Sequence, residues 1–503
     1  MNDAATEFVE AAVRRYDEEL NRAGFRTTRC GESPADWSWV GHVEPEHEEL
    51  TVSLKEGFPF AAPRVALPAR AGTADWHQTA DGVLCLWDTH AQGDLPWLDA
   101  AELLGRVQQW IRNAADGWVA DAPQLDLEAY NSPRVITRRG QSVLPILIID
   151  RWADLADHWF RATMPTDTGL MELKGYPRRT PPATSSVRSR RRRRGRGRPD
   201  RFVNGIAVDL GEMTHPLIPT DDLLDALGVQ TPTVGGLLTA GRPVLVAARY
   251  SRAGVHGLMG FWLEPQGDGV IRGCLPVVER EASQHRRAGW HASSIADRTV
   301  TVIGAGSIGS YVADLLHRSG VHDLHVHDSD LLLPGNLVRH AASAAQVGAM
   351  KADAVRDTAA QRDPSWPITA RPRINSLAEA VELLRDRDLV VDCTGDRRIW
   401  HLMRAAADIA GKSFVHVAVM GHGQYGRVDI CPPLDGAEPL DEDPVVGVAL
   451  TEWEGGCGDP VSPTPPIAVL ETAAMGARFA LRMLAGEQVP PAGESRALFP
   501  DVA

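Results

Sequence analysis

The sequence predicts a multidomain chain of mixed α/β and α+β class, with an α+β domain near its N-terminus and a parallel-sheet α/β domain near its C-terminus. Three observations support this prediction. The 503 residues exceed what one compact core usually holds. An amphipathic helix pattern followed by short extended segments opens the chain. From residue 299 onward, apolar strand patterns alternate with helix patterns, which is typical of a parallel sheet.

The N-terminal elements follow from residue spacing. Phe8, Tyr16 and Leu20 stand at helical spacing, so residues 1–24 predict an amphipathic helix. Residues 37–67 contain three short extended pieces broken by glycine and proline, which predict an antiparallel meander. Residues 99–113 predict a second amphipathic helix with Asp99 as its cap. These elements predict one domain over residues 1–120.

The middle of the chain carries less information. Residues 121–200 lose periodicity and gain proline and arginine, which predicts a linker. Within it, residues 188–198 hold eight arginines. Such a run could bind nucleic acid or an acidic partner, or it could stay solvated, and its proline- and serine-rich surroundings favour the solvated linker. Residues 201–290 predict a β-rich segment of unknown role, and residues 291–490 predict the C-terminal α/β domain.

Composition excludes several classes of protein. The net charge of −14 argues against a general nucleic-acid binder, because phosphate contacts need clustered cations. No apolar run reaches the length of about 20 residues that spans a membrane, and the acidic N-terminus does not resemble a secretory signal. The six cysteines form no C-x-x-C pair, which argues against a disulfide scaffold and common zinc sites. We therefore expect a cytoplasmic protein with free thiols.

A glycine-rich segment predicts a nucleotide site. The strand pattern of residues 299–303 leads into Gly304, Gly306 and Gly309, which allow a tight turn and close approach of a phosphate to a helix N-terminus. Asp328 ends the next predicted strand, at the separation where an acid binds a ribose hydroxyl. Taken alone, this pattern fits an NAD enzyme as well as an ATP enzyme.

The residues that follow favour ATP. Asn336, Arg339 and Lys351 bring donors and positive charge into one connection, where a dehydrogenase needs none. Positioned cations stabilise the charge that develops when a triphosphate is cleaved. A later strand pattern ends at Asp392 and is followed by Asp396. Carboxylates at this end of a parallel strand face the ligand side of the sheet and could hold Mg²⁺.

Taken together, residues 290–485 resemble the Rossmann-like adenylation domain shared by ubiquitin-activating enzymes and the ThiF/MoeB sulfur-carrier adenylyltransferases. The resemblance rests on GAGSIGS, the acid at 328, N-L-x-R at 336–339, the lysine at 351, DCTGD at 392–396 and a later strand at 414–430. It implies that ATP and Mg²⁺ are bound, that Asp328 binds ribose, and that Arg339 and Lys351 contact phosphates. The family usually has D-x-T-D, whereas Gly395 follows the threonine here, so the resemblance leaves the metal ligand open between Asp392 and Asp396.

Two cysteines extend the resemblance. Cys457 lies in a glycine-rich stretch before a predicted helix from about residue 467, where the activating enzymes carry the cysteine that accepts the acyl group from AMP. Residues 1–120 resemble a prokaryotic ubiquitin-conjugating fold through the proline-rich residues 58–63, His77 and the D-G-x-L-C-L segment that contains Cys85. Thr79 stands where eukaryotic members have an asparagine, and His77 is expected to brace the loop.

The two resemblances imply an acyl relay. ATP would activate a protein C-terminus as an acyl-adenylate, Cys457 would form a thioester, Cys85 would accept it, and a target amine would attack last. This arrangement resembles fused conjugation enzymes encoded beside cyclic-nucleotide anti-phage systems (CBASS). There the donor is a CD-NTase (the nucleotidyltransferase partner), and a ubiquitin-like protein is a second option. The family implies a homodimer. A sulfur-carrier adenylyltransferase, a NAD-binding oxidoreductase and a non-catalytic adaptor are the alternatives.

Overall fold

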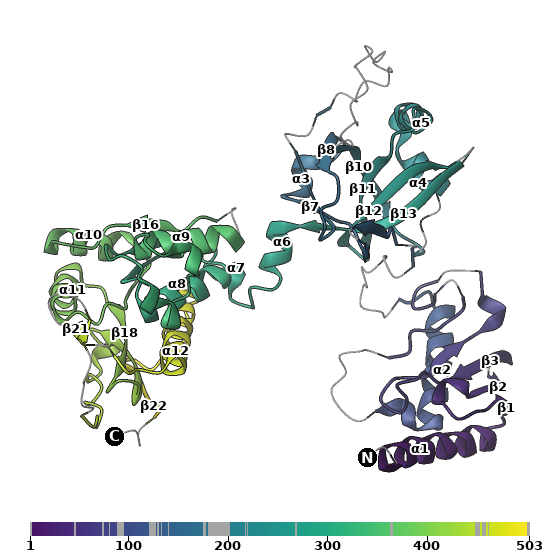
Figure 1. Cartoon of the computed structure of the whole chain (residues 1–503), viewed down its shortest axis with the longest axis horizontal. Coiled ribbons are helices and arrows are strands. Elements are labelled where there is room, and N and C mark those ends of the chain that lie inside the picture. The colour runs from purple at the N-terminus through teal and green to yellow at the C-terminus, as the bar shows by residue number, and fades with distance from the viewer. Residues whose placement is uncertain are drawn as a thin grey trace. The chain divides into compact units, whose positions relative to one another are not determined.

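Figure 1 shows the computed structural model of the chain. It folds into two compact units, residues 1–280 and residues 281–503. Among the described residues, no helix is both long and apolar enough to traverse a lipid bilayer. The structure describes residues 3–44, 47–72, 75–79, 81–87, 95–119, 127, 130–131, 133–138, 140–174, 178–179, 202–216, 218, 220–266, 269–362, 366–447, 453–454, 459–460 and 462–499.

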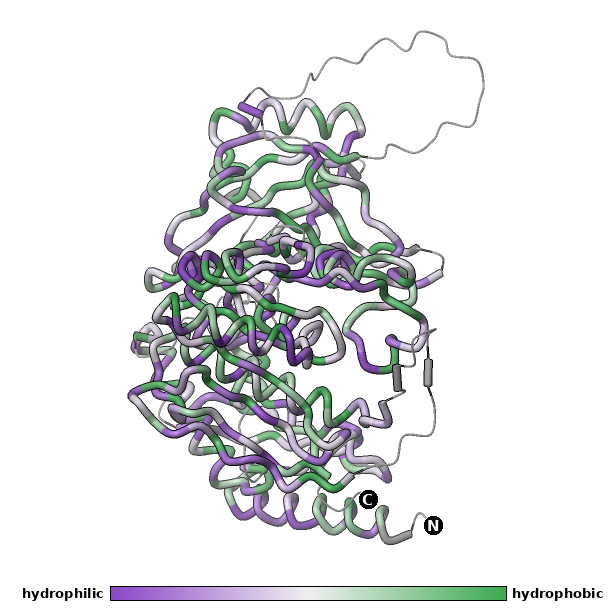
Figure 2. Tube along the Cα trace, turned by 90° about the vertical axis from the view of Figure 1, so that its left-hand side faces the viewer, coloured by the Kyte–Doolittle hydropathy of each residue, from purple (hydrophilic) through white to green (hydrophobic). Residues whose placement is uncertain are grey.

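The first part of unit 1 is the predicted α+β arrangement. Tyr16 and Leu20 of the first helix are buried, and hydrophilic and hydrophobic residues alternate along that helix in Figure 2. The carboxylate of Asp99 caps the second helix by accepting hydrogen bonds from the amides of Ala101 and Glu102. Both helices and the antiparallel meander are confirmed. The elements are α1 (Asp3–Arg22), β1 (Arg26–Arg29), β2 (Ser38–Val43), β3 (Glu48–Ser53), β4 (Arg64–Ala66) and α2 (Ala100–Ala115), with sheet order β1-β2-β3-β4.

A seven-stranded sheet forms the second part of unit 1, in the order β8-β10-β11-β12-β13-β7-β9. Its strands are β7 (Ile146–Ile149), β8 (Trp159–Thr163), β9 (Leu170–Glu172), β10 (Phe202–Glu212), β11 (Val244–Arg252), β12 (Val255–Gln266) and β13 (Gly269–Glu279). The remaining elements of this part are the pair β5 (Ile136–Arg138) and β6 (Gln141–Val143), and the helices α3 (Trp152–Leu155), α4 (Thr220–Ala226) and α5 (Thr231–Thr239).

The expected linker over 121–200 differs from the structure, because β7, β8 and β9 belong to this sheet. These strands are only three to five residues long, which is too short for an alternating apolar pattern to be recognised in the sequence. Their buried side chains, such as Leu147 and Met171, pack with the strands from residue 202 onward. The arginine run at 188–198 lies outside the described residues.

The two parts of unit 1 share one core. The indole Nε1 of Trp76 donates a hydrogen bond to the carbonyl oxygen of Thr214, at 3.2 Å. The guanidinium of Arg252 lies over the Trp76 ring, 3.8 Å from its centroid. Buried residues of both parts form a single hydrophobic cluster. Residues 1–280 therefore fold as one unit.

Unit 2 contains the predicted α/β sheet. The strand order is β16-β15-β14-β17-β18-β19-β22. The strands β16, β15, β14, β17 and β18 run parallel, β19 is antiparallel to β18, and β22 is antiparallel to β19. The strands are β14 (Thr299–Ile303), β15 (Asp323–His327), β16 (Thr369–Arg371), β17 (Leu389–Asp392), β18 (Phe414–Met420), β19 (Tyr425–Cys431) and β22 (Gly493–Ala497), with a separate pair β20 (Trp453–Glu454) and β21 (Asp459–Pro460). The helices are α6 (Arg280–His285), which spans the boundary of the units, α7 (Ala292–Ile295), α8 (Ser307–Arg318), α9 (Lys351–Arg362), α10 (Leu377–Asp386), α11 (Arg397–Ala410) and α12 (Pro466–Leu484).

Helices cover both faces of this sheet. Val300 and Val302 of β14 pack into a core that contains residues of α8, α9 and α12. Ile303 and Val390 face the opposite core, with residues of α10 and α11. Strand order reverses between β14 and β17, and ligands bind open α/β sheets at such a reversal, beyond the carboxyl ends of the strands.

Residues 414–430 differ from the single strand expected from the sequence. They form two strands, β18 and β19, which pair in antiparallel fashion. Gly421 and Gly423 in the turn between them have φ angles of 55° and 113°. Because glycine adopts positive φ readily, these residues allow the chain to reverse within one continuous apolar pattern.

Candidate functional site

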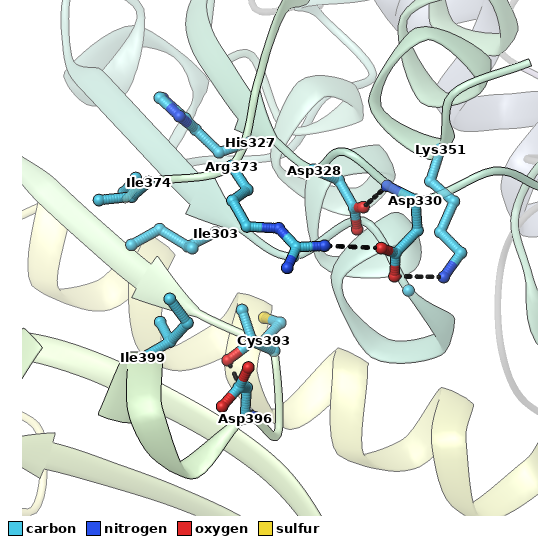
Figure 3. A pocket seen from close by; sticks show the side chains of 13 residues that line it. Ile303, His327, Asp328, Asp330, Lys351, Arg373, Ile374, Cys393, Asp396 and Ile399 are labelled. Carbon is cyan, nitrogen blue, oxygen red and sulfur yellow. Dashed lines mark hydrogen bonds and ion pairs between the residues drawn. The ribbon is translucent and has the colours of Figure 1, made fainter. Parts of the chain in front are cut away.

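A cavity of about 240 Å³ lies at the carboxyl ends of β14, β15 and β17 (Figure 3). This is the edge of the sheet where the strand order reverses. Both charged and apolar side chains reach it. The lining residues are Ile303, Gly304, Gly306, His327, Asp328, Asp330, Lys351, Arg373, Ile374, Cys393, Thr394, Asp396 and Ile399.

The three predicted glycines have different surroundings. Gly304 has a φ of +86°, which favours glycine. A Cβ on Gly309 would lie 1.8 Å from the carbonyl oxygen of Gly304, so this position admits no side chain. A Cβ on Gly306 would meet nothing within 4 Å, and Gly306 stands directly before α8. The open space beside this helix N-terminus suits an anion such as a phosphate.

Asp328 joins the glycine loop to the next strand. One oxygen of its carboxylate accepts a hydrogen bond from the amide of Ala305, and the other accepts from the amide of Asp330, both at 2.7 Å. The side chain also lines the cavity. Its place at the carboxyl end of β15 is the place predicted from the sequence.

Lys351 lines the cavity with two charged residues that the sequence analysis missed. The Lys351 Nζ lies 3.0 Å from one oxygen of Asp330, and a guanidinium nitrogen of Arg373 lies 2.9 Å from the other. Figure 3 shows the two cations approaching Asp330 from opposite sides. The D-x-D spacing of Asp328 and Asp330 could have indicated the second acid, whereas nothing in the local pattern singled out Arg373.

Arg339 and Asn336 do not line the cavity. The Arg339 guanidinium donates hydrogen bonds to the carbonyl oxygens of Ser462, at 3.0 Å, and Thr464, at 3.1 Å. The Asn336 side chain accepts a hydrogen bond from the amide of Leu333, at 2.9 Å. In this structure the Arg339 side chain holds the distant segment at 462–464 and the Asn336 side chain closes a local turn, so neither lines the cavity.

The two candidate metal ligands differ in location. Asp392 is fully buried, where its carboxylate accepts hydrogen bonds from Thr394 and lies 3.0 Å from Nδ1 of His416. Asp396 lines the cavity and caps α11, and hydrogen bonds from Arg398 lower the pKa of its carboxyl group. Asp396 is therefore the better placed of the two.

No cluster of three or more His, Cys, Asp or Glu side chains suited to a metal occurs in the part of the chain that the structure describes. A single carboxylate still fits Mg²⁺, because this ion commonly takes one or two carboxylates together with substrate phosphates and water. The residues present thus fit Mg²⁺ that arrives with a nucleotide.

One of the two candidate thiols lies within the described residues. Cys85 is exposed, and its amide donates a hydrogen bond to the carbonyl oxygen of His77 at 2.8 Å. Neighbouring atoms still desolvate the sulfur and raise the pKa of the Cys85 thiol. The His77 amide donates to the hydroxyl of Tyr130, and its ring lies against Trp118 with 4.4 Å between centroids. His77 is thus placed to brace the loop.

Cys457 lies outside the described residues. Two other cysteines have raised thiol pKa values: burial does this for Cys393 and, together with Asp429, raises the pKa of Cys431 to about 12. At neutral pH both therefore remain protonated.

The cavity combines features that fit a nucleotide. A helix N-terminus and Lys351 suit phosphates, the carboxylate of Asp328 suits ribose hydroxyls, and the isoleucines suit a flat base. Asp396 lies opposite the cations in Figure 3, and Thr394 also lines the cavity. This set can bind a nucleotide and hold a cation beside it.

Comparison with known proteins agrees with this geometry. The chain is 30% identical over 218 residues to the ATP-dependent ubiquitin transferase-like protein Cap2 of Enterobacter hormaechei, covering 40% of this chain and 36% of that protein. It is 29% identical over 205 residues to molybdopterin-synthase adenylyltransferase of Escherichia coli, covering 40% of this chain and 78% of that protein. The chain thus spans about a third of the first curated relatives that it matches.

The biosynthetic enzyme MccB of microcin C7, solved in complex with N-formylated MccA, aligns with 44% of this chain and 71% of its own, at 14% identity and a TM-score of 0.33. The ThiF family model matches residues 286–437, which include the glycine loop, Asp328, Lys351, Arg373 and Asp396. The C-terminal region of this chain is therefore a ThiF domain, and the chain is homologous to the Cap2 proteins.

Proposed function

We propose that the protein uses ATP to adenylate the C-terminal carboxylate of a protein substrate and then passes the acyl group between two cysteines to an amine. The observation that carries the proposal is the cavity of the ThiF domain, where an open helix N-terminus meets Lys351, Asp328 and Asp396. The similarity to Cap2 of Enterobacter hormaechei, with its ubiquitin transferase-like name, supports a protein substrate.

The first step forms an acyl-adenylate. A carboxylate oxygen of the substrate attacks the α-phosphorus of ATP, and the bond from that phosphorus to the bridging oxygen breaks as pyrophosphate leaves. Lys351 and the helix N-terminus at Gly306 stabilise the negative charge that moves onto the phosphates. Mg²⁺ supplies further positive charge when bound, and Asp396 is the residue that would hold it.

The second part of the proposal is the relay. The Cys457 thiolate attacks the acyl carbon and releases AMP, the Cys85 thiolate displaces Cys457 by thioester exchange, and a target amine displaces Cys85 to form an amide. The exposure of Cys85 and the fixed loop around it support its part. The donor is a ubiquitin-like protein or a CD-NTase, the amine belongs to a target protein, and the enzyme acts as a homodimer in anti-phage defence.

A sulfur-carrier adenylyltransferase is the second candidate. The match to 78% of the length of molybdopterin-synthase adenylyltransferase favours it. That activity needs the cavity of the ThiF domain and makes no use of Cys85. The Cys85→Ala variant distinguishes the two: the relay predicts a thioester on Cys457 with no amide product, and the sulfur-carrier activity predicts unchanged product.

The test of the proposed function is an ester trap. The Cys85→Ser variant is incubated with ATP and a lysate, and mass spectrometry identifies any C-terminal peptide joined through an ester to the introduced hydroxyl. We expect one donor peptide, lost when Cys457→Ala or Lys351→Ala is added. Lys412→Ala is the matched control, because the Lys412 ammonium donates hydrogen bonds to the carbonyl oxygens of Arg385 and Arg387 and does not line the cavity. Trapping that needs no ATP would refute the proposal.

A further inference from the structure

We infer that Arg373 binds the base of the nucleotide, because its guanidinium is placed to cover one face of the base while an isoleucine wall supports the other face. The inference rests on the proposed use of ATP and assigns the base to one end of the cavity. Ile303, Ile374 and Ile399 form that wall, as Figure 3 shows.

The wall comes from three elements that the fold brings together. Ile303 ends β14, Ile374 follows β16, and Ile399 lies in the first turn of α11. Ile303 and Ile374 are each at most 2% exposed, so their positions are fixed by packing. Ile399 is only partly buried, so a flat aromatic base can bury apolar area against it, whereas a phosphate gains nothing from this surface.

The main chain that carries Arg373 is held firmly. Its amide donates a hydrogen bond to the hydroxyl of Ser329 at 2.9 Å, and the preceding Pro372 carbonyl lies 2.9 Å from Nδ1 of His327. The amide of Asp328 donates to the carbonyl oxygen of Arg371 at 3.1 Å. These contacts join the segment after β16 to the end of β15, so the backbone from which the Arg373 side chain extends is held in place.

Asp330 fixes the far end of the Arg373 side chain. Its carboxylate contacts a single guanidinium nitrogen, and the side chain stays 48% exposed, so much of the planar group faces the cavity and solvent. The other oxygen of Asp330 holds Lys351. In Figure 3 the two cations lie on opposite sides of this carboxylate, and Arg373 is on the side of the isoleucines.

This division assigns different roles to the two cations. Lys351 is a compact charge suited to phosphates, and arginine is planar, weakly hydrated and able to stack on an aromatic ring. A stacked guanidinium is expected to change affinity by about tenfold, which corresponds to about 1.4 kcal/mol and lies within the range of a cation–π contact. Arg373 is therefore placed to favour nucleotides over ligands that carry phosphates alone.

The test compares three probes on the full-length protein: ATP, adenosine and inorganic tripolyphosphate, each titrated against a fluorescent ATP analogue. We expect Arg373→Ala to bind ATP and adenosine about tenfold more weakly and tripolyphosphate as tightly as the wild type. Arg373→Lys should fail to restore adenosine binding, because it keeps the charge and loses the plane. Arg371→Ala is the matched control, since Arg371 lies two residues away and does not line the cavity.

Three results would overturn the inference: an equal loss of tripolyphosphate binding, rescue of adenosine binding by lysine, or unchanged affinity for all probes. Thermal melting of Arg373→Ala alongside the wild type excludes misfolding as the cause of a loss. If the probes give the expected pattern but the Cys85→Ser variant traps no donor, the role of Arg373 is supported and the proposed reaction is refuted. A wild type that binds no purine overturns both.

Discussion

Gly306 stands directly before α8 and Gly309 lies in its first turn, and an added methyl group would meet different surroundings at each. At Gly309 it would collide with the Gly304 carbonyl, and at Gly306 it would enter open space in the cavity. We expect Gly309→Ala to lower the free energy of unfolding by about 1–3 kcal/mol, as overpacking does. Gly306→Ala should leave stability unchanged and weaken ATP binding at least about tenfold, because it occupies the anion position.

Urea unfolding and ATP titration of the two variants check this pair. Each variant serves as the control for the other, because the substitution is identical and only the space around it differs. A Gly306→Ala protein with wild-type affinity for ATP would show that no phosphate lies at the start of α8.

Cys85 supplies a second prediction at the residue scale. Burial raises the pKa of its thiol above the ordinary value of 9.0, so only about 1% or less is thiolate at neutral pH. We expect the rate of alkylation by iodoacetamide to rise with pH through 9 without levelling off below it. Peptide mass spectrometry follows the modification, and Cys85→Ser removes the signal. A plateau below about pH 8 would reveal a nearby cation that lowers the pKa.

Single residues also show how far the sequence could lead. Glycine spacing and the strand end at Asp328 suffice to predict the cavity, since both follow from local chain geometry. The sequence does not reveal Asp330 and Arg373 as cavity residues, because they meet only when the segment after β16 packs beside the end of β15. The expected phosphate contact of Arg339 depends on a side-chain direction, and here that side chain turns toward Ser462.

At the scale of elements, β15 carries a pH-sensitive histidine. Burial, and then the neighbouring Arg387, lower the pKa of His325 from 6.5 to about 4. Between these values the unfolded chain takes up a proton that the folded chain does not. The stability present above pH 6.5 is therefore lost as the pH falls toward 4.

The His325 side chain is 15% exposed, so solvent screens part of the effect. We expect the contribution of this residue to lower the free energy of unfolding by about 2 kcal/mol on acidification. Urea unfolding at about pH 7 and about pH 5 measures it. His325→Gln should reduce the pH dependence, part of which remains because burial also lowers the pKa values of His327 and His340. His401→Gln, on an exposed site of α11, should leave it unchanged. An equal slope in His325→Gln would assign the acid sensitivity elsewhere.

Element prediction succeeded where the apolar pattern is long and the caps are strong. Asp99 marks the start of α2, and residues 299–303 match β14. It failed for β7, β8 and β9, whose pairing partners lie far along the chain. It also merged β18 with β19, because both strands are apolar and only the glycines of the turn separate them.

The division into two units makes a prediction for the whole molecule. The core of unit 2 is built from residues of unit 2 alone, and the cavity is lined only by them. We expect a fragment of residues 281–503 to fold and bind ATP with the affinity of the full chain, and residues 1–280 to bind none. Calorimetric titration of both fragments checks this, and a large loss of affinity in the C-terminal fragment would contradict it.

The cavity is assembled from five stretches of chain that meet only once the parallel sheet has formed. A small molecule bound there contacts the ends of β14, β15 and β17 at once, and the unfolded chain offers it no binding site. At a hundredfold excess over its dissociation constant it would add about 2.7 kcal/mol to the stability of the whole unit. Melting temperature can thus serve as a rapid screen for nucleotides, before any donor protein has been found.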